Sequence, residues 1–362
     1  MVHIPMDRRS EAAEEPVVLL TDDMKATLRV PYALRHVPVS RICTLLPYPR
    51  CPQSGDIVLA QLERIGKNTR LELASGRTCN LHVGDLLAVA FGNRYATQQF
   101  EGYAQSEDDC CDLLSMGGVC GLVKTRHAAV AEPSRLRLLG SLGDAQGRTL
   151  QLRDFALRTD HAATRPLVVV VCGSAMDSGK THAAANLILG LRRDRQRVAS
   201  IKLTGTAAGR DVWKTMDTGA CVAHDFVDGG YPSTYLCTLQ ELLDLHHRLV
   251  SHAASKGADW VIMEIADGLL QRETSGLLQS PAFRDTVDCW VFTTNDPLGA
   301  VGGLSILRGW GITPTAISGI ITTSPLAMQE AEAATGVRCL TADQLAGGIL
   351  NGQLHEIAGH RA

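Results

Sequence analysis

The chain has 362 residues, of which 45% are hydrophobic and 20% charged, and its formal net charge is −3 at pH 7. This composition excludes a collagen-like, fibrous or mainly disordered chain. The near-neutral charge provides no basic surface of the kind that nucleic-acid binding needs, so we expect no nucleic-acid partner. A chain of this length favours two domains.

Eleven cysteines are scattered along the chain without the paired spacing of a zinc site, which favours a reducing cytoplasm. No stretch reaches the roughly 18 apolar residues of a membrane span, and residues 1–16 are rich in charge, without the apolar run of a signal peptide. We therefore expect a soluble, cytoplasmic protein with no membrane partner and a flexible segment over residues 1–16.

Residues 17–157 alternate short apolar runs with turn residues. The runs at 57–60 and 86–90 each follow a Gly-Asp pair, as strands that begin after tight turns often do. This pattern predicts a compact, mostly-β domain with a role in substrate binding or oligomerisation. Three of its residues are candidates to reach a substrate across a cleft between the domains: Arg94, Arg126 and His127.

The pattern changes at residue 166. Leu167–Val171 is apolar at every position, which is typical of a strand buried on both faces of a parallel sheet. Further strands are predicted over 198–202, 260–264, 286–293 and 316–322, and helices over 180–194, 237–256, 299–310 and 325–336. We therefore predict an α/β P-loop domain with a doubly wound, mostly parallel sheet over residues 166–350, followed by a C-terminal tail over 351–362.

The loop after the first of these strands reads GSAMDSGKT from Gly173 to Thr181 and opens a helix. A strand, a small-residue loop and a Gly-Lys-Thr helix start together wrap a triphosphate with backbone N–H groups and a lysine. Five residues separate the two glycines, one more than in the common motif. The residues predicted to bind the nucleotide are Gly173, Ser174, Met176, Ser178, Gly179, Lys180, Thr181 and His182.

The five-residue gap resembles the loop of the dethiobiotin synthetase-like P-loop family. In that family the next strand ends in a lysine followed by a substrate-binding turn, as Lys202 is here, and a later strand ends in a metal-binding glutamate, which Glu264 matches. A magnesium-binding aspartate follows the lysine strand; Asp217 is the best match and Asp211 the alternative. The resemblance covers about residues 167–345 and implies ATP and Mg²⁺ as cofactors.

Phosphoryl transfer needs charge neutralisation and alignment more than covalent catalysis by side chains. Lys180 is predicted to neutralise the β- and γ-phosphates, Lys202 to hold an anionic acceptor, and Arg272 to clamp its carboxylate. Asp177 is a further catalytic candidate in the loop. The resemblance places Thr322 near the base, and the predicted metal ligands are Thr181, Asp217 and Glu264.

We therefore predict a Mg-ATP-dependent synthetase or ligase that phosphorylates a small-molecule carboxylate or carbamate and then forms an amide or a ring. One alternative is a small-molecule kinase, a transferase that phosphorylates a hydroxyl. Another is a nucleotide switch or metal-insertion factor, although residues 174–178 lack the extra lysine that such switches carry. ATP is expected over GTP because no guanine signature occurs, and a homodimer is expected.

Overall fold

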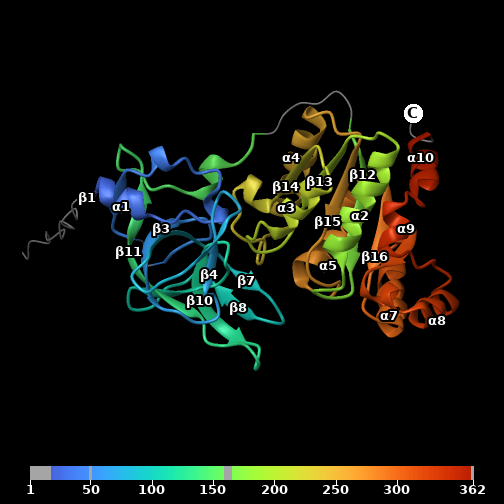
Figure 1. The fold of residues 1–362 in the computed structure, drawn as a ribbon, viewed down its shortest axis with the longest axis horizontal. Helices are drawn as coiled ribbons and strands as arrows, with labels where there is room; N and C mark the ends of the chain where they lie inside the picture. Colours follow the sequence, from blue (N-terminus) through green and yellow to red (C-terminus); the bar gives the residue numbers. More distant parts are fainter. Residues whose placement is uncertain (1–17, 49–50, 159–164, 360–362) are drawn as a thin grey trace, which may run out of the picture.

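The computed structural model describes residues 18–48, 51–158 and 165–359. Figure 1 shows two units beside each other: an N-terminal unit rich in strands, and a C-terminal unit in which helices flank a sheet. The fold class is confirmed, because a mostly-β domain precedes a doubly wound parallel sheet of the P-loop type. The segment predicted to be flexible, 1–16, lies outside the described residues.

The N-terminal sheet has nine strands. They are β1 (Val18–Leu19), β2 (Thr44–Leu46), β3 (Ile57–Arg64), β6 (Leu86–Phe91), β7 (Arg94–Tyr95), β8 (Phe100–Tyr103), β9 (Cys110–Leu113), β10 (Val119–Arg126) and β11 (Ser134–Gly143). Their hydrogen-bonded order is β1-β2-β11-β3-β6-β10-β8-β7, with β9 beside β10 and β11. Only β6 and β10 pair in parallel within this part of the described chain.

Alternating side chains of β3 enter two separate hydrophobic clusters, as the period of two of a strand requires. Ile57 and Leu59 belong to one cluster, and Val58 and Ala60 to the other. The strand is therefore buried on both faces. Smaller elements complete this domain: α1 (Asp22–Thr27), η1 (Tyr32–Leu34), η2 (Val39–Arg41), η3 (Leu152–Phe155), and the paired strands β4 (Arg70–Glu72) and β5 (Thr78–Asn80).

The C-terminal sheet has six parallel strands. They are β12 (Leu167–Gly173), β13 (Val198–Lys202), β14 (Val222–Asp225), β15 (Trp260–Glu264), β16 (Cys289–Thr293) and β17 (Ala316–Ser318). The order β14-β13-β15-β12-β16-β17 places β12 inside the sheet. Val168 and Val170 of β12 face one hydrophobic cluster and Val169 and Val171 the other, which explains its unbroken apolar run.

Helices cover both faces of this sheet (Figure 1). They are α2 (Lys180–Arg193), α3 (Arg210–Asp217), α4 (Leu239–Ser255), α5 (Arg272–Gln279), α6 (Pro281–Arg284), α7 (Pro297–Gly309), α8 (Pro325–Thr335), α9 (Ala342–Ala346) and α10 (Asn351–Gly359), with the short turns η4 (Phe226–Gly229) and η5 (Ile320–Thr323). Helices α2, α9 and α10 share one hydrophobic cluster, whereas α4, α5 and α7 belong to the other.

Two segments differ in detail from the sequence predictions. Residues 351–359 of the predicted C-terminal tail form α10, in which Leu354 is buried in the core and the Asn351 amide donates hydrogen bonds to Gly190 O and Asp194 Oδ2, each at 2.9 Å. The strand predicted over 316–322 ends at Ser318, because Gly319 adopts a φ of +96°. No helix in the described part of the chain is long and apolar enough to cross a membrane.

A buried set of charges joins the two domains. The Arg35 guanidinium donates to Asp225 Oδ1 at 2.8 Å and to Asp228 Oδ2 at 2.6 Å. The Tyr32 hydroxyl donates to Asp225 Oδ2 at 2.7 Å, and His36 Nε2 lies 2.7 Å from Asp228 Oδ1. These five residues, called here the interdomain joint, hold the N-terminal domain against the carboxyl end of β14 and thereby beside the candidate site.

Candidate functional site

The phosphate loop connects β12 to α2 and is shaped by close backbone contacts. Gly179 has a φ of +95°, a left-handed conformation that favours glycine. A Cβ on Gly173 would lie 2.3 Å from Ser178 Oγ, so the loop folds tightly over the strand end. Helix α2 begins without a side-chain cap, which leaves its first N–H groups free to bind phosphate oxygens.

Lys180 lies inside this loop. Only 6% of the residue is exposed, and its Nζ donates a hydrogen bond to the Ala175 carbonyl oxygen at 2.7 Å. Burial lowers the pKa of Lys180, and the charges of Glu264 and Asp267 partly oppose that effect. The ammonium is therefore held where a triphosphate would enter, without a carboxylate in direct contact.

Three charged side chains meet beyond the loop. Lys202 ends β13 and pairs in register with Glu264, which ends β15, so the parallel sheet brings the two together; Lys202 Nζ lies 3.7 Å from Glu264 Oε1. Lys202 also forms an ion pair with Asp211, from the first turn of α3. Burial opposes the charge of Lys202, but Glu264 and Asp211 outweigh it and raise its pKa.

The oxygen atoms near the loop suit Mg²⁺, which takes one or two protein carboxylates and completes its coordination with water and substrate phosphates. Thr181 lines the pocket beside Asp211 and Glu264. Burial opposes ionisation of Asp211, but Lys202 and the Thr181 hydroxyl outweigh it and lower its pKa, so this side chain is a carboxylate. No group of three or more His, Cys, Asp or Glu residues placed to hold a metal occurs in the described ranges.

Asp217, the preferred metal ligand from the sequence, is not brought to this site. It is the last residue of α3 and is exposed, outside the pocket. Asp211 stands near the start of the same helix and lines the pocket. Six helical residues separate them by about 9 Å along the axis, so both cannot contact one ion at the loop. Of the two candidate ligands, only Asp211 lines the pocket.

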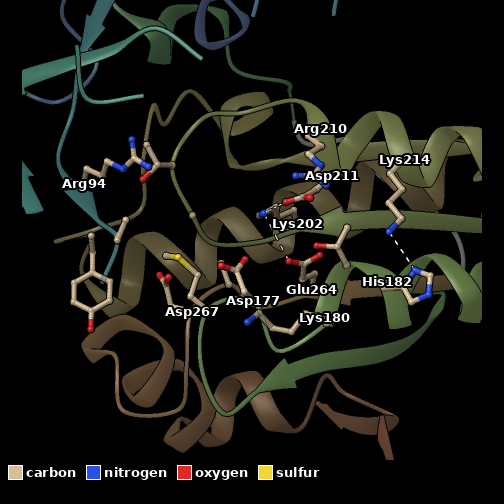
Figure 2. Close-up of a pocket in the computed structure, with 18 residues that line it drawn as sticks. Arg94, Asp177, Lys180, His182, Lys202, Arg210, Asp211, Lys214, Glu264 and Asp267 are labelled. Atoms are coloured by element: carbon tan, nitrogen blue, oxygen red, sulfur yellow. Dashed lines mark hydrogen bonds and ion pairs between the residues drawn. The ribbon is translucent and has the colours of Figure 1, made fainter. Parts of the chain in front are cut away.

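The pocket around these residues has a volume of about 380 Å³ (Figure 2). Its lining includes predicted site residues, namely Met176, Asp177, Gly179, Lys180, Thr181, His182, Lys202 and Glu264. Gly173, Ser174 and Ser178 instead form the frame of the loop, where Ser178 Oγ lies 2.8 Å from Thr293 Oγ1. His182 is exposed, and its Nδ1 lies 3.3 Å from Lys214 Nζ.

Arg272 and Thr322 also lie outside the pocket. The Arg272 side chain is 66% exposed and pairs with Glu273 at 2.8 Å, so it does not point at the loop as the acceptor clamp would. Thr322 donates to Gly319 O at 2.8 Å within η5. That turn contacts the phosphate loop through Ile320 N and Ser178 O at 3.2 Å, so Thr322 is near the loop without lining the pocket.

Sequence reasoning missed two cations of the pocket, Arg210 and Lys214, and gave Asp267 no defined role. Asp267 follows β15 with a φ of +63°, and burial raises its pKa to about 6. The signal for Arg210 and Lys214 was their four-residue spacing, which puts both on one face of a helix. That helix was not predicted, because it is only eight residues long.

Arg94 of the N-terminal domain also lines the pocket, whereas Arg126 and His127 do not. Figure 2 shows Arg94 on the side of the pocket opposite His182 and Lys214. The site is therefore built from both domains: the C-terminal domain supplies the phosphate loop and the Lys202 cluster, and the strand β7 of the N-terminal domain forms a facing wall.

A buried central strand, a glycine-lysine-threonine loop and an uncapped helix define a P-loop nucleotide-binding fold. No family model and no curated protein matches the chain. Among solved structures it is similar to the signal recognition particle 54 kDa protein of Aeropyrum pernix in complex with GDP, with 18% identity, a TM-score of 0.38, and coverage of 57% of this chain and 51% of that one.

Two structures of the signal recognition particle receptor FtsY are also similar. The one from Elizabethkingia anophelis has 16% identity, a TM-score of 0.36, and coverage of 52% of this chain and 62% of that one. The one from Mycoplasma mycoides has 12% identity, a TM-score of 0.36, and coverage of 50% and 62%. The chain thus matches less than two thirds of each of these proteins, and the site geometry alone carries the functional argument below.

Proposed function

We propose that the chain is a Mg²⁺- and nucleoside-triphosphate-dependent phosphoryl-transfer enzyme that activates a carboxylate or carbamate of a small acceptor. The observation that carries this proposal is the position of Lys202, an ammonium 18% exposed in a pocket that continues from the phosphate loop to the N-terminal domain. The part of the pocket between Lys202 and the N-terminal domain provides room for a second reactant.

Different residues of the site have different roles in such a reaction. Lys180 and the free N–H groups of α2 bind the β- and γ-phosphates, and Lys202 holds the acceptor anion against the γ-phosphate, which lowers the repulsion between the two anions. Mg²⁺ would neutralise the phosphates further when bound, and Thr181, Asp211 and Glu264, which line the pocket, would hold it.

In this reaction an acceptor oxygen attacks the γ-phosphorus. The bond from that phosphorus to the β,γ-bridging oxygen breaks, and its electron pair leaves with the nucleoside diphosphate. An amine then attacks the acyl phosphate, and inorganic phosphate leaves as an amide or a ring forms.

Hydroxylamine tests this proposal, because it converts an acyl phosphate into a hydroxamate. The protein is incubated with Mg²⁺, with ATP or GTP, and with mono- and dicarboxylates, and hydroxamate and released phosphate are measured. We expect nucleotide-dependent hydroxamate formation that the Lys180→Ala variant lacks. A stable phosphate ester on a hydroxyl acceptor, without hydroxamate, would establish the kinase alternative instead.

A second candidate function is a nucleotide-driven switch that acts as a homodimer. The observation that favours it is a row of exposed leucines after the carboxyl ends of three strands: Leu270 and Leu298 are each 83% exposed, and Leu326 is 71% exposed. Exposed apolar side chains that gather on one edge are typical of association surfaces. This row lies at the edge of the sheet that carries the phosphate loop.

Sedimentation with and without a non-hydrolysable nucleotide separates the two functions. Reversible dimerisation that requires the nucleotide, together with slow hydrolysis that no acceptor stimulates, would support the switch. A constant oligomeric state with acceptor-stimulated turnover would support the transfer enzyme.

A further inference from the structure

The N-terminal domain presents a buried cation to the pocket. Arg94 begins β7, lines the pocket, and is only 9% exposed. Its guanidinium donates to the Leu114 carbonyl oxygen and, at 2.8 Å, to Gln99 Oε1, and it lies 5.9 Å from the centre of the Phe100 ring. These contacts fix its orientation.

Arg94 has no carboxylate partner. Both of its hydrogen bonds go to neutral oxygens, its Nε has no hydrogen-bond partner, and no ion pair involves it among the described residues. Burial lowers the pKa of Arg94 to about 10. A guanidinium carries five N–H donors, so three of them remain unused here. A buried charge of this kind is costly unless an anion compensates it.

The anion that the chain itself offers is a poor partner. Asp267 is the carboxylate whose charge acts on Arg94, but no hydrogen bond joins the two, and burial raises the pKa of Asp267 to about 6. The Asp267 carboxyl makes no hydrogen bond of its own among the described side chains. Arg94 and Asp267 thus leave an unsatisfied donor group and an unsatisfied acceptor group in one pocket.

A small separate cavity beside Tyr95, the residue after Arg94, is lined by hydroxyl groups. Its walls are Tyr95 and Tyr235, whose ring centres are 5.5 Å apart, together with Thr206, Ser233 and Thr234, and its volume of about 10 Å³ has room for at most about one water molecule. The lining of this cavity includes Asp267 and no Lys or Arg. Arg94 is therefore the cation of the pocket without a paired carboxylate on the side of the N-terminal domain, whereas Lys202 is paired with Asp211 and Glu264.

We propose that the acceptor carries a second carboxylate, separate from the group that is phosphorylated, and that Arg94 binds it. The proposal rests on the proposed function, because it assigns the reacting group of the same acceptor to Lys202. Arg94 binds the carboxylate with its free N–H donors in the forked geometry that guanidinium groups provide. The substrate class is then a small dicarboxylate or an amino acid with a side-chain or terminal carboxylate.

Calorimetric titration of the full chain saturated with Mg-ADP tests this assignment. The probes are linear dicarboxylates from malonate to adipate, aspartate and glutamate, and inorganic phosphate as a competing anion. At least one carboxylate probe should bind the wild type, and its affinity should fall by at least about 10-fold in Arg94→Met, the loss expected for a charge-assisted hydrogen bond. Arg94→Lys keeps the positive charge but not the forked pair of N–H donors, so carboxylate affinity should fall less in this variant than in Arg94→Met.

Three further measurements make the assignment specific. ADP affinity should change by less than about 3-fold in both Arg94 variants, which is small beside a tenfold effect per 1.4 kcal/mol. Arg126→Met, which removes a cation of the same domain that pairs with Glu132 outside the pocket, should bind the carboxylate normally. Asp267→Asn removes a negative charge beside the subsite and should tighten carboxylate binding; this variant keeps the test informative if Arg94→Met does not fold.

Several results would overturn the assignment. Absence of binding by every carboxylate probe to the Mg-ADP complex would do so, as would equal loss of ADP and carboxylate affinity in the Arg94 variants. Phosphate binding that exceeds carboxylate binding would show that the subsite serves a phosphate group instead. If the wild type does not bind Mg-ADP at all, the proposed function itself has failed, which is a separate and recognisable outcome.

Discussion

Replacing Arg35 by methionine tests how strongly the interdomain joint stabilises the chain. Arg35 is the common partner of two carboxylates, and its side chain is 9% exposed, whereas those of Asp225 and Asp228 are 0% and 5% exposed. Methionine fills much of the same space but leaves two buried carboxylates without their cation. The perturbation is therefore electrostatic more than steric.

The expected magnitude follows from this burial. Removing one partner of a buried ion pair costs roughly 3–5 kcal/mol, because the remaining charge stays desolvated. Asp225 keeps the Tyr32 hydroxyl and the Val227 N–H, and Asp228 keeps His36, so the carboxylates are not wholly unpartnered. We expect the free energy of the first unfolding transition to fall by about 3–5 kcal/mol.

The effect should depend on pH. Burial raises the pKa of Asp228, but the neighbouring His224, the contact with His36 and the charge of Arg35 outweigh this and hold the pKa well below its usual range. A carboxyl with a depressed pKa in the folded state stabilises the fold above its unfolded pKa of about 4, and that stabilisation is lost as the pH falls towards the folded value. The difference between wild type and Arg35→Met should therefore be full at neutral pH and shrink below about pH 4.

Urea titration followed by tryptophan fluorescence measures this difference. Trp213 is a suitable reporter because its Nε1 donates to Glu72 Oε1 at 2.9 Å across the domain boundary. The control is Arg137→Met, which breaks a pair with Glu63 in which the arginine side chain is 60% exposed; exposed pairs contribute about 0–1 kcal/mol. An Arg35→Met variant within about 1 kcal/mol of the wild type at neutral pH would refute the reasoning.

Three further predictions concern the pocket. Gly179→Ala places a methyl carbon 2.8 Å from Gly319 Cα, at a residue whose backbone is left-handed. The nucleotide affinity measured by calorimetry should therefore fall by about 10-fold or more. The control is Gly276→Ala, whose added carbon meets nothing within 4 Å and which should bind the nucleotide normally. Lys180→Ala should abolish turnover in a phosphate-release assay and leave the urea midpoint of unfolding unchanged. Retained turnover would show that the phosphate loop is not part of the active site. Burial raises the pKa of Asp267 to about 6. The charged carboxylate therefore destabilises the fold above that pH. Below about pH 4 the carboxyl is neutral in both the folded and the unfolded state, and it has no such effect. Asp267→Asn should therefore raise the free energy of unfolding by up to about 3 kcal/mol near pH 8 and leave it unchanged near pH 4; the same gain at both pH values would contradict this cause.

The parts of the site that the sequence predicted are those with local signals. Strand, loop and helix lie within a single run of residues, so β12 and α2 could be placed from an apolar run and a Gly-Lys-Thr helix start. The strand ends at Lys202 and Glu264 were also predicted, because each terminates an apolar run with a charged residue. Parallel pairing then brought these two side chains together.

The parts that the sequence could not predict depend on contacts between distant segments. The sequence favoured Asp217 over Asp211, and only the placement of α3 shows that Asp211 is the one that lines the pocket. Helix α10 has few apolar residues, and its attachment depends on an Asn351 contact with Gly190, 161 positions earlier. Arg94 stands in a domain with no recognisable motif, so its place in the pocket required the interdomain geometry.

The N-terminal domain does more than cover the nucleotide-binding domain, because it also positions α3. The Glu72 carboxylate accepts hydrogen bonds from the Gly209 N–H at 2.8 Å and from Trp213 Nε1 at 2.9 Å, at the beginning and in the first turn of that helix. A Cβ on Gly209 would lie 2.6 Å from Glu72 Oε1, so the two domains approach closely at this point. Asp211 stands between these contacts, which means that its position beside Lys202 depends on Glu72. The phosphate loop is thus formed by a single run of residues in the C-terminal domain, whereas the acceptor side of the pocket is formed by residues of both domains.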